Sequence, residues 1–171
     1  AYAPQRVLTN AELEKMVATN GDWIVSRTGI RERRIAGAEE ATSDLAAAAG
    51  RQALDFAGVA PEDVDMIIVA TVTGDTPTPA CAAYVQAKLG AKNACAFDVG
   101  AACAGSLYGL TIADQFIRSG AMKHVLVIGA ETLSRFVDWT NRETCVLFGD
   151  AAGAILLGAT EEPGHGLLAS T

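Results

Sequence analysis

One cysteine, Cys103, lies among small residues at positions 100–105, between a predicted strand and a predicted helix. The apolar run 95–99 predicts a buried strand, and apolar side chains at helical spacing over 107–117 predict a helix that Gly120 ends. The free N–H groups and the dipole of a helix N-terminus favour negative charge. A thiol there loses its proton more readily than at its free pKa of ~8.5, and the same N–H groups can hold the oxyanion of a thioester under attack. The pattern indicates a nucleophile elbow with cysteine in place of serine.

The alternative for Cys103 is a small buried hydrophobic residue, which is the usual role of a free cysteine. The other three cysteines are Cys81, Cys95 and Cys145. Their spacing contains no CxxC pair and no histidine at zinc-binding distance, so we expect no metal site. We also expect no disulfide framework, because the chain is long and apolar enough to build a core without one. Four reduced thiols are typical of a cytoplasmic protein.

Length and composition limit the function classes. The chain has 171 residues, of which 50% are hydrophobic, and its formal net charge is −7. This favours one well-buried domain and argues against general nucleic-acid binding. No apolar run approaches the ~20 residues of a membrane span, so no membrane association is expected. The opening AYAPQRV contains no initiator Met and no secretory leader, and we expect further residues upstream.

A second cluster of chemically capable residues begins at Trp23. The arginines at 27, 31, 33 and 34 follow it within a few positions. One interpretation is a solvated face that nearby acidic residues balance, and the other is an anion site for phosphate or an acidic partner. Trp23 either stacks on a flat ring beside these arginines or packs under the loop. The residues alone leave both alternatives open.

The elements expected to position these residues alternate between helices and strands. The predicted helices, each with a capping or breaking residue at an end, are residues 10–20, 42–56, 80–89 and 107–119. The predicted strands are residues 66–71, 95–99, 125–130 and 154–158. Residues 22–30 are predicted to connect elements, 74–79 and 131–148 to be loops, and 149–153 to be a turn. Alternation of this kind predicts an α/β fold with a mostly parallel sheet and helices on both faces.

Four segments then resemble one family in order along the whole chain. DWIVSRTGIRERR (22–34), AFDVGAACAG (96–105), ADQFIRSGA (113–121) and FGDAAGA (148–154) are similar to the β-ketoacyl-acyl-carrier-protein synthase III family. The resemblance implies a thiolase-like fold, with residues 1–171 as the N-terminal half of an αβαβα sandwich and the C-terminal half outside this sequence. It implies a five-stranded sheet of order 3-2-1-4-5, whose central first strand is missing here. Ala151 replaces a frequent glycine and Gly100 a frequent alanine.

The resemblance also implies roles for single residues. Cys103 corresponds to the nucleophile that accepts the acyl group. Trp23 and Arg142 correspond to the pair that sandwiches the adenine of coenzyme A. Neighbouring positions complete the site: Arg27 and Thr28 at coenzyme A, and Thr78, Leu147 and Phe148 at the acyl pocket.

The expected activity is transfer of an acyl group from acyl-CoA to Cys103, followed by condensation with malonyl-acyl-carrier-protein to start fatty acid synthesis. We expect a homodimer joined through the strand near 94–99, with no permanently bound cofactor and no metal. The histidine and asparagine that the family uses for condensation would lie beyond residue 171, and we expect His124 and His165 to be surface residues. Alternatives are a relative that primes polyketide or other secondary-metabolite synthesis, and a non-catalytic partner subunit. A cysteine peptidase is disfavoured because no histidine or asparagine matches the family context.

Overall fold

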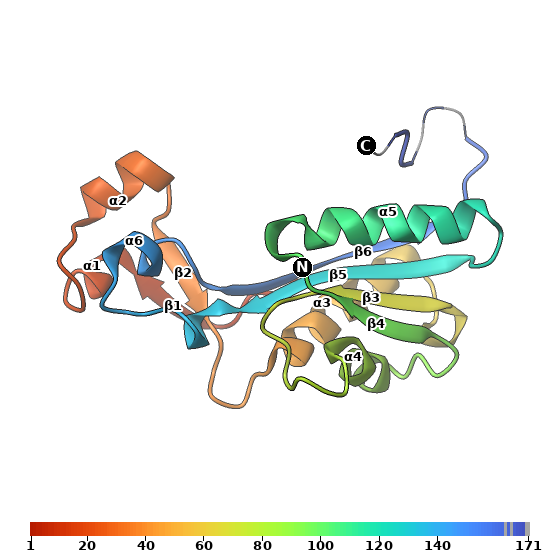
Figure 1. The fold of residues 1–171 in the computed structure, drawn as a ribbon, viewed down its shortest axis with the longest axis horizontal. Coiled ribbons are helices and arrows are strands. Elements are labelled where there is room, and N and C mark those ends of the chain that lie inside the picture. Colours follow the sequence, from red (N-terminus) through yellow and green to blue (C-terminus); the bar gives the residue numbers. More distant parts are fainter. Residues whose placement is uncertain (163, 165, 170–171) are drawn as a thin grey trace.

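A four-stranded sheet, together with the helices that cover it, forms the larger part of the molecule (Figure 1). The structure, a computed structural model, describes residues 1–162, 164 and 166–169. The strands lie in the order β4 (Cys95–Val99), β3 (Met66–Ala70), β5 (His124–Thr132) and β6 (Asp150–Gly158). β3 pairs in parallel with β4 and β5, whereas β6 runs antiparallel to β5.

Helices cover both faces of this sheet, as expected from the alternation of elements. α3 (Thr42–Ala57) and α4 (Cys81–Leu89) lie on one face, and α5 (Gly105–Arg118) lies on the other (Figure 1). All five residues of β3 are buried. Ile67 and Val69 join the apolar cluster beneath α3 and α4, and Met66 and Ile68 join the cluster beneath α5. β3 is therefore buried on both faces, which confirms its prediction from a continuous apolar run.

A smaller module extends from one end of the sheet (Figure 1). It contains the antiparallel pair β1 (Arg6–Thr9) and β2 (Glu32–Ile35) and three short helices, α1 (Asn10–Leu13), α2 (Gly21–Thr28) and α6 (Arg142–Cys145). Its own apolar cluster consists of Leu8, Leu13, Ile24, Ile35, Cys145 and Val146. Among the described residues, 3₁₀ turns also occur at Pro61–Asp63, Ala102–Ala104 and Leu133–Arg135.

Capping residues set several helix ends where the sequence predicts them. Thr9 and Glu12 form a reciprocal capping box at the start of α1. Gly58 and Gly90 follow α3 and α4 with φ of 65° and 77°, a left-handed conformation that glycine adopts without a steric penalty.

Four local predictions are wrong. The first helix, predicted over residues 10–20, already ends at Leu13. Residues 22–30 are not a connecting segment, because Asn20 accepts a hydrogen bond from the Trp23 amide (2.8 Å) and begins α2, which Gly29 ends at φ 74°. Residues 149–153 are not a turn, because β6 already begins at Asp150 and pairs with β5 from there. Half of the predicted loop 131–148 belongs to the end of β5, a 3₁₀ turn and α6.

The predicted strand order is also wrong. β3 pairs directly with β5, so no place exists between them for a central first strand. Instead, Tyr2 forms an antiparallel bridge with Ala152, which puts the first residues of the chain at the open edge of β6. The sheet has four strands within the described residues, as expected for a five-stranded sheet whose first strand is missing from this sequence.

Exposure along β4 and α5 differs from the prediction as well. β4 is an edge strand and is only partly buried. Leu107, predicted on the apolar face of α5, is 64% exposed. The fully buried residues of α5 are Gly105, Gly109 and Ala113. Beside them the partly buried Leu110, Ile112 and Ile117 pack against the sheet, as their spacing predicts. The periodicity of apolar residues does not reveal the fully buried line, because two of its members are glycines.

Substitution of Gly109 tests this close contact. A Cβ atom at Gly109 would lie 2.9 Å from Val127 Cγ1 and 3.5 Å from Ile68 Cγ2. Crowding of this kind costs ~1–3 kcal/mol, against a helix-propensity gain of ~1 kcal/mol. We expect Gly109→Ala to lower the free energy of unfolding in urea by about 1 kcal/mol. The control Gln115→Ala, on the exposed side of the same helix, should cause no loss. A more stable Gly109→Ala variant would contradict the packing described here.

Candidate active site

A tight turn between β4 and α5 carries Cys103. The strand ends at Val99, and the 3₁₀ turn Ala102–Ala104 leads directly into the helix at Gly105. Ala102 has φ 45°, in the left-handed region that residues with a Cβ atom rarely adopt. A Cβ atom at Gly105 would lie 3.0 Å from that of Ala70, so the helix begins in close contact with β3. The turn exposes the Cys103 thiol, which excludes the buried-hydrophobe alternative.

A cavity of about 730 Å³ opens beside this thiol. Its lining includes Cys103 and Phe148, two of the predicted site residues. Leu147 and Thr78 are exposed and do not line it. Most other lining groups are apolar or small, and they include Val72, Leu110, Val127, Gly129, Leu133 and Ile155. The cavity can therefore hold an aliphatic chain next to the Cys103 thiol.

The sequence prediction missed these other lining residues, and two of them follow strands. Val72 comes two residues after the end of β3, and Leu133 comes directly after β5. Ligands in open α/β sheets bind outside the carboxyl ends of parallel strands. The signal for both residues is therefore their position just beyond a predicted strand.

A polar network fixes the strand ends at the edge of the cavity. The Glu131 carboxylate, at the end of β5, accepts hydrogen bonds from the Val72 amide (2.9 Å) and the Thr71 hydroxyl (3.2 Å), and from the hydroxyl of Thr73. The Thr132 amide in turn donates to the Thr73 hydroxyl (2.8 Å). These bonds hold the segment after β3 against β5 and so fix the part of the wall that Val72 forms.

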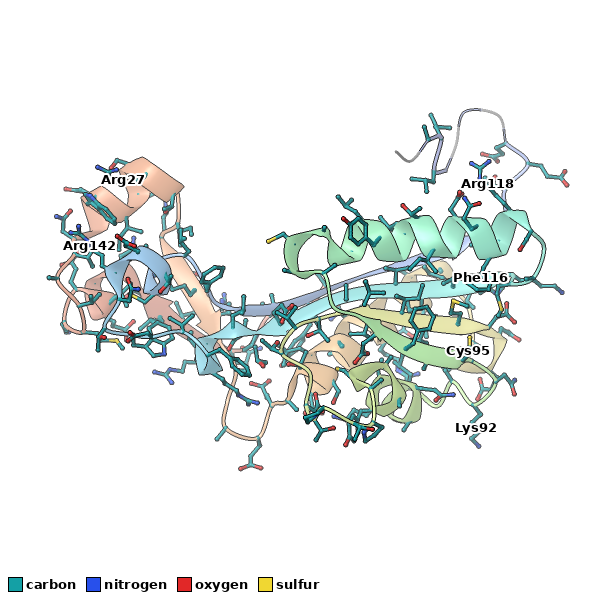
Figure 2. The ribbon with its side chains drawn as sticks, in the orientation of Figure 1. Arg27, Lys92, Cys95, Phe116, Arg118 and Arg142 are labelled. Atoms are coloured by element: carbon teal, nitrogen blue, oxygen red, sulfur yellow. The ribbon has the colours of Figure 1, made fainter. Side chains whose placement is uncertain are left out.

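The predicted coenzyme A residues come together at the module end of the molecule. The guanidinium carbons of Arg142 and Arg27 lie 4.6 Å and 4.9 Å from the centroid of the Trp23 ring, within the range of cation–π contact. Figure 2 shows Arg27 and Arg142 close together on α2 and α6. Trp23 also packs partly against the apolar cluster of the module. Trp23 is thus partly packed in the module, which fits one alternative, and its contacts with the two arginines leave stacking on a ligand ring a prediction.

The Thr28 hydroxyl is engaged locally. It donates to the Ile24 carbonyl (2.8 Å) and accepts from the Ile30 amide (3.0 Å). These two bonds shape the end of α2 and the chain that leaves it. Any contact that Thr28 makes with a ligand would therefore be additional to this structural role.

The clustered arginines separate from one another. Arg33 is buried, with 4% of its surface exposed, whereas Arg31 is exposed. Arg34 lies 3.7 Å from the Glu32 carboxylate and donates to the Pro4 carbonyl (3.2 Å). The four arginines therefore do not form one basic surface for an anion.

The four thiols fall into two classes. Cys103 and Cys95 are exposed, and Cys81 and Cys145 are buried. Burial and the nearby carboxylates of Asp75 and Asp98 raise the pKa of Cys81 to about 12. Burial likewise raises the pKa of Cys145. Cys81 consequently stays protonated and unreactive at pH 8.

His124 does not form a catalytic pair with Cys103. His124 is half-buried at the start of β5, where its amide donates to Asp65 (2.9 Å) and its Nδ1 contacts the Asp63 carbonyl oxygen (3.0 Å). Glu131 at the cavity lies seven residues further along the strand, a separation of roughly 20 Å. His165 lies outside the described residues. Within the described part of the chain, no helix is both long and apolar enough to cross a membrane.

Known proteins are similar to this chain along nearly its whole length. Residues 97–171 match the family model described as 3-oxoacyl-[acyl-carrier-protein (ACP)] synthase III. The chain is 56% identical over 170 residues to a β-ketoacyl-[acyl-carrier-protein] synthase III of Caldanaerobacter subterraneus subsp. tengcongensis, covering 99% of this chain and 51% of that protein. It is 58% identical over 164 residues to the protein of that name in Thiobacillus denitrificans, covering 95% and 51%.

Solved structures give the same result. The 3-oxoacyl-[acyl-carrier-protein] synthase III of Aquifex aeolicus VF5 matches with a TM-score of 0.92 and 53% identity, over 94% of this chain and 52% of that one. The priming β-ketosynthase of the R1128 polyketide pathway matches with a TM-score of 0.92 and 40% identity, over 95% and 49%. The chain thus spans about half the length of the curated relatives it matches.

Alkylation tests how the turn presents Cys103. A short pulse of iodoacetamide at pH 8 should modify the exposed Cys103 and Cys95 and leave Cys81 and Cys145 unmodified, because burial keeps the last two as thiols. Peptide mass spectrometry gives the modified fraction at each position. Alkylation after unfolding in urea serves as the control, since all four should then react. Rapid modification of Cys81 in the folded protein, or protection of Cys103, would contradict the arrangement.

Proposed function

We infer that this chain, a member of the β-ketoacyl-[acyl-carrier-protein] synthase III family by sequence and fold, takes an acyl group from acyl-CoA onto Cys103. In the complete protein, that group is then condensed with malonyl-acyl-carrier-protein to begin fatty acid synthesis. One observation carries this proposal, namely the exposed thiol on a tight turn beside a mostly apolar cavity.

The chemistry needs a thiol nucleophile and a leaving thiol. Cys103 Sγ attacks the thioester carbonyl carbon, the bond from that carbon to the coenzyme A sulfur breaks, and coenzyme A leaves as a thiol with one proton. The acyl chain then lies in the cavity. Loss of CO₂ from the malonyl group supplies a carbanion, which attacks the acyl carbon and releases Cys103. Acyl-CoA is a substrate and coenzyme A is a product, and no permanently bound cofactor takes part.

Coenzyme A would bind at the module end. We place its adenine between the Trp23 ring and the Arg142 guanidinium, which already contact each other at 4.6 Å and would part to admit it. Arg27, over the same ring at 4.9 Å, is placed to meet the phosphates. Thr28 would contribute mainly through the shape that it gives the end of α2.

The far part of the acyl pocket would need a second copy of the chain. Thr78 is exposed in the loop after β3 and lies outside the cavity lining of its own chain. β4 is an edge strand with unpaired backbone groups on one side, and pairing with a second β4 would remove that edge. A homodimer of this kind would let Thr78 of one copy close the pocket of the other, beside Phe148 and Leu147.

A C-terminal half would cover the outer side of α5. Leu107 and Tyr108 are 64% and 56% exposed on this helix, an apolar surface typical of an interface. In this proposal residues 1–171 are the N-terminal half of the sandwich and carry the nucleophile. The second half would supply the histidine and asparagine for condensation. The protein would act in the cytoplasm, where its carrier-protein and coenzyme A substrates meet.

Priming of polyketide or other secondary-metabolite synthesis is the second candidate. The 40% identity to the R1128 priming enzyme supports it, although the relatives named synthase III are more similar. Both candidates use the same Cys103 chemistry and differ in the acyl donor and carrier protein. A partner subunit without chemistry is disfavoured because Cys103 is present and exposed.

Acyl loading tests the proposed function. Incubation of the full-length protein with acyl-CoA, without malonyl-acyl-carrier-protein, should add one acyl group, and peptide mapping should place it on Cys103. Cys103→Ala should abolish the addition, because no other described thiol lines the cavity. Cys95→Ala is the matched control and should load like the wild type. Acyl groups on Cys95, or loading that survives Cys103→Ala, would refute the assignment.

Replacement of the tryptophan tests the coenzyme A site. Trp23→Ala should weaken coenzyme A binding by ~1–3 kcal/mol, as measured by calorimetry, because stacking of a base on an aromatic ring contributes about that much. Trp139→Phe is the control, since Trp139 donates from Nε1 to the Ser134 carbonyl (3.1 Å) and has no contact with Arg142 among the cation–π pairs described. Equal affinity in Trp23→Ala and wild type, with an unchanged circular dichroism spectrum, would return Trp23 to a purely packing role.

A further inference from the structure

The buried Arg33 has no role in the proposed chemistry. Only 4% of its surface is exposed, and no carboxylate pairs with it among the ion pairs of the described residues. Its Nη1 donates to Asn10 Oδ1 (2.9 Å) and its Nη2 donates to the Val146 carbonyl (2.8 Å). Its Nε has no partner within the part of the chain that is described. A buried charge without a counter-ion is costly, so its two bonds need an explanation.

The bond to Asn10 leads to the helix that carries Trp23. Asn10 Nδ2 donates to the Ile30 carbonyl (2.9 Å), and the Ile30 amide donates to the Thr28 hydroxyl (3.0 Å). Thr28 is the last residue of α2. Through this short sequence of hydrogen bonds, the guanidinium of Arg33 is tied to the C-terminal end of the helix on which Trp23 and Arg27 stand.

The bond to Val146 leads to the helix that carries Arg142. Val146 directly follows α6, which begins at Arg142. The same backbone continues to Phe148, which lines the cavity. Gly149 then packs on Arg33 again, because a Cβ atom at Gly149 would lie 3.0 Å from Arg33 Cβ. Arg33 therefore contacts the chain on both sides of Phe148.

These contacts place one side chain at the base of two parts of the site. The planar guanidinium presents donors in a fixed fork, so it can fix the distance between an amide oxygen and a backbone carbonyl. A lysine has a single ammonium and cannot hold both acceptors in the same geometry. Burial excludes water, which would otherwise compete for the two acceptors.

We propose that Arg33, supported by Asn10, is a positioning residue that sets α6 against α2 and thereby keeps Trp23, Arg142 and Phe148 in register. The proposal rests on the proposed function, because the relative position of these side chains matters only for an acyl-CoA that reaches from the Trp23–Arg142 contact to the cavity. Arg33 touches neither substrate nor the reacting atoms. It acts through the backbone at Val146 and Gly149.

The test compares Arg33→Met with Arg31→Met in the full-length protein. Both variants lose one positive charge, but Arg31 is exposed and holds none of the contacts above through its side chain. Arg33→Met should raise the KM for acyl-CoA in Cys103 loading by about tenfold or more, since small misplacements of a bound substrate have effects of this order. The rate at which iodoacetamide modifies Cys103 should stay at the wild-type value, and Arg31→Met should match the wild type in both measurements.

A lysine variant separates charge from geometry. Arg33→Lys keeps the charge and should leave KM clearly above the wild-type value. A wild-type KM in Arg33→Lys would show that the paired guanidinium donors are not needed, and would overturn that part of the proposal. A KM within about twofold of wild type in Arg33→Met, together with a lower melting temperature, would show that Arg33 is only structural and would overturn the proposal.

A third readout keeps this inference distinct from the proposed function. Hydrogen–deuterium exchange without any ligand should be faster in Arg33→Met than in wild type at α2 and at residues 142–148, and unchanged in Arg31→Met. If the wild type takes no acyl group, the proposed function fails, and exchange alone decides the role of Arg33. Unchanged exchange in both segments would then overturn the tie between α2 and α6.

Discussion

The close approach of α5 to the sheet is the constraint on which the rest of the site depends. Gly105, Gly109 and Ala113 face β3 and β5, and a side chain at either glycine would collide with Ala70 or Val127. The helix therefore lies low on the sheet, and the chain must turn tightly to enter it from β4. The 3₁₀ turn that results presents the Cys103 thiol at the cavity instead of burying it. Larger residues on this face would lift the helix and move the nucleophile.

The Trp23–Arg142 contact, the second part of the site, depends on how the chain returns from the sheet to the smaller module. The module carries Trp23 on α2, and the return of the chain after β5 brings Arg142 to it on α6. The segment that follows α6 then supplies Phe148 to the cavity and enters β6 at Asp150. Asp150 accepts hydrogen bonds from the Ala36 amide (2.7 Å) and the Ser134 hydroxyl (2.6 Å), which fixes this crossing point. One continuous stretch thus joins the Trp23–Arg142 contact to the cavity beside Cys103.

The sequence was informative where local chemistry decides the structure. The position of Cys103 on a strand-to-helix turn is encoded by small residues beside an apolar run, and the end of α3 by Gly58. The mixture of Trp, Arg and Gly with apolar residues in 22–30 favours a connecting segment over a helix. Asn20 carries the capping signal that predicts α2. The strand order that the resemblance implies is wrong, and the residues themselves could not correct it, because pairing between distant segments, such as the bridge from Tyr2 to β6, leaves no local pattern. The pattern of apolar residues does not identify the fully buried positions of α5, because two of them are glycines, which carry no hydropathy signal.

The central claim is that the acyl group transferred to Cys103 lies in the cavity, and that the coenzyme A that donates it binds across Trp23. The most direct measurement is a crystal structure of the full-length protein soaked with acyl-CoA in the absence of malonyl-acyl-carrier-protein. The account predicts continuous electron density from Cys103 Sγ into the cavity past Phe148, with adenine between Trp23 and Arg142 in molecules that retain coenzyme A. An unmodified Cys103 with the cavity filled by protein side chains, or an acyl group bound elsewhere, would contradict it.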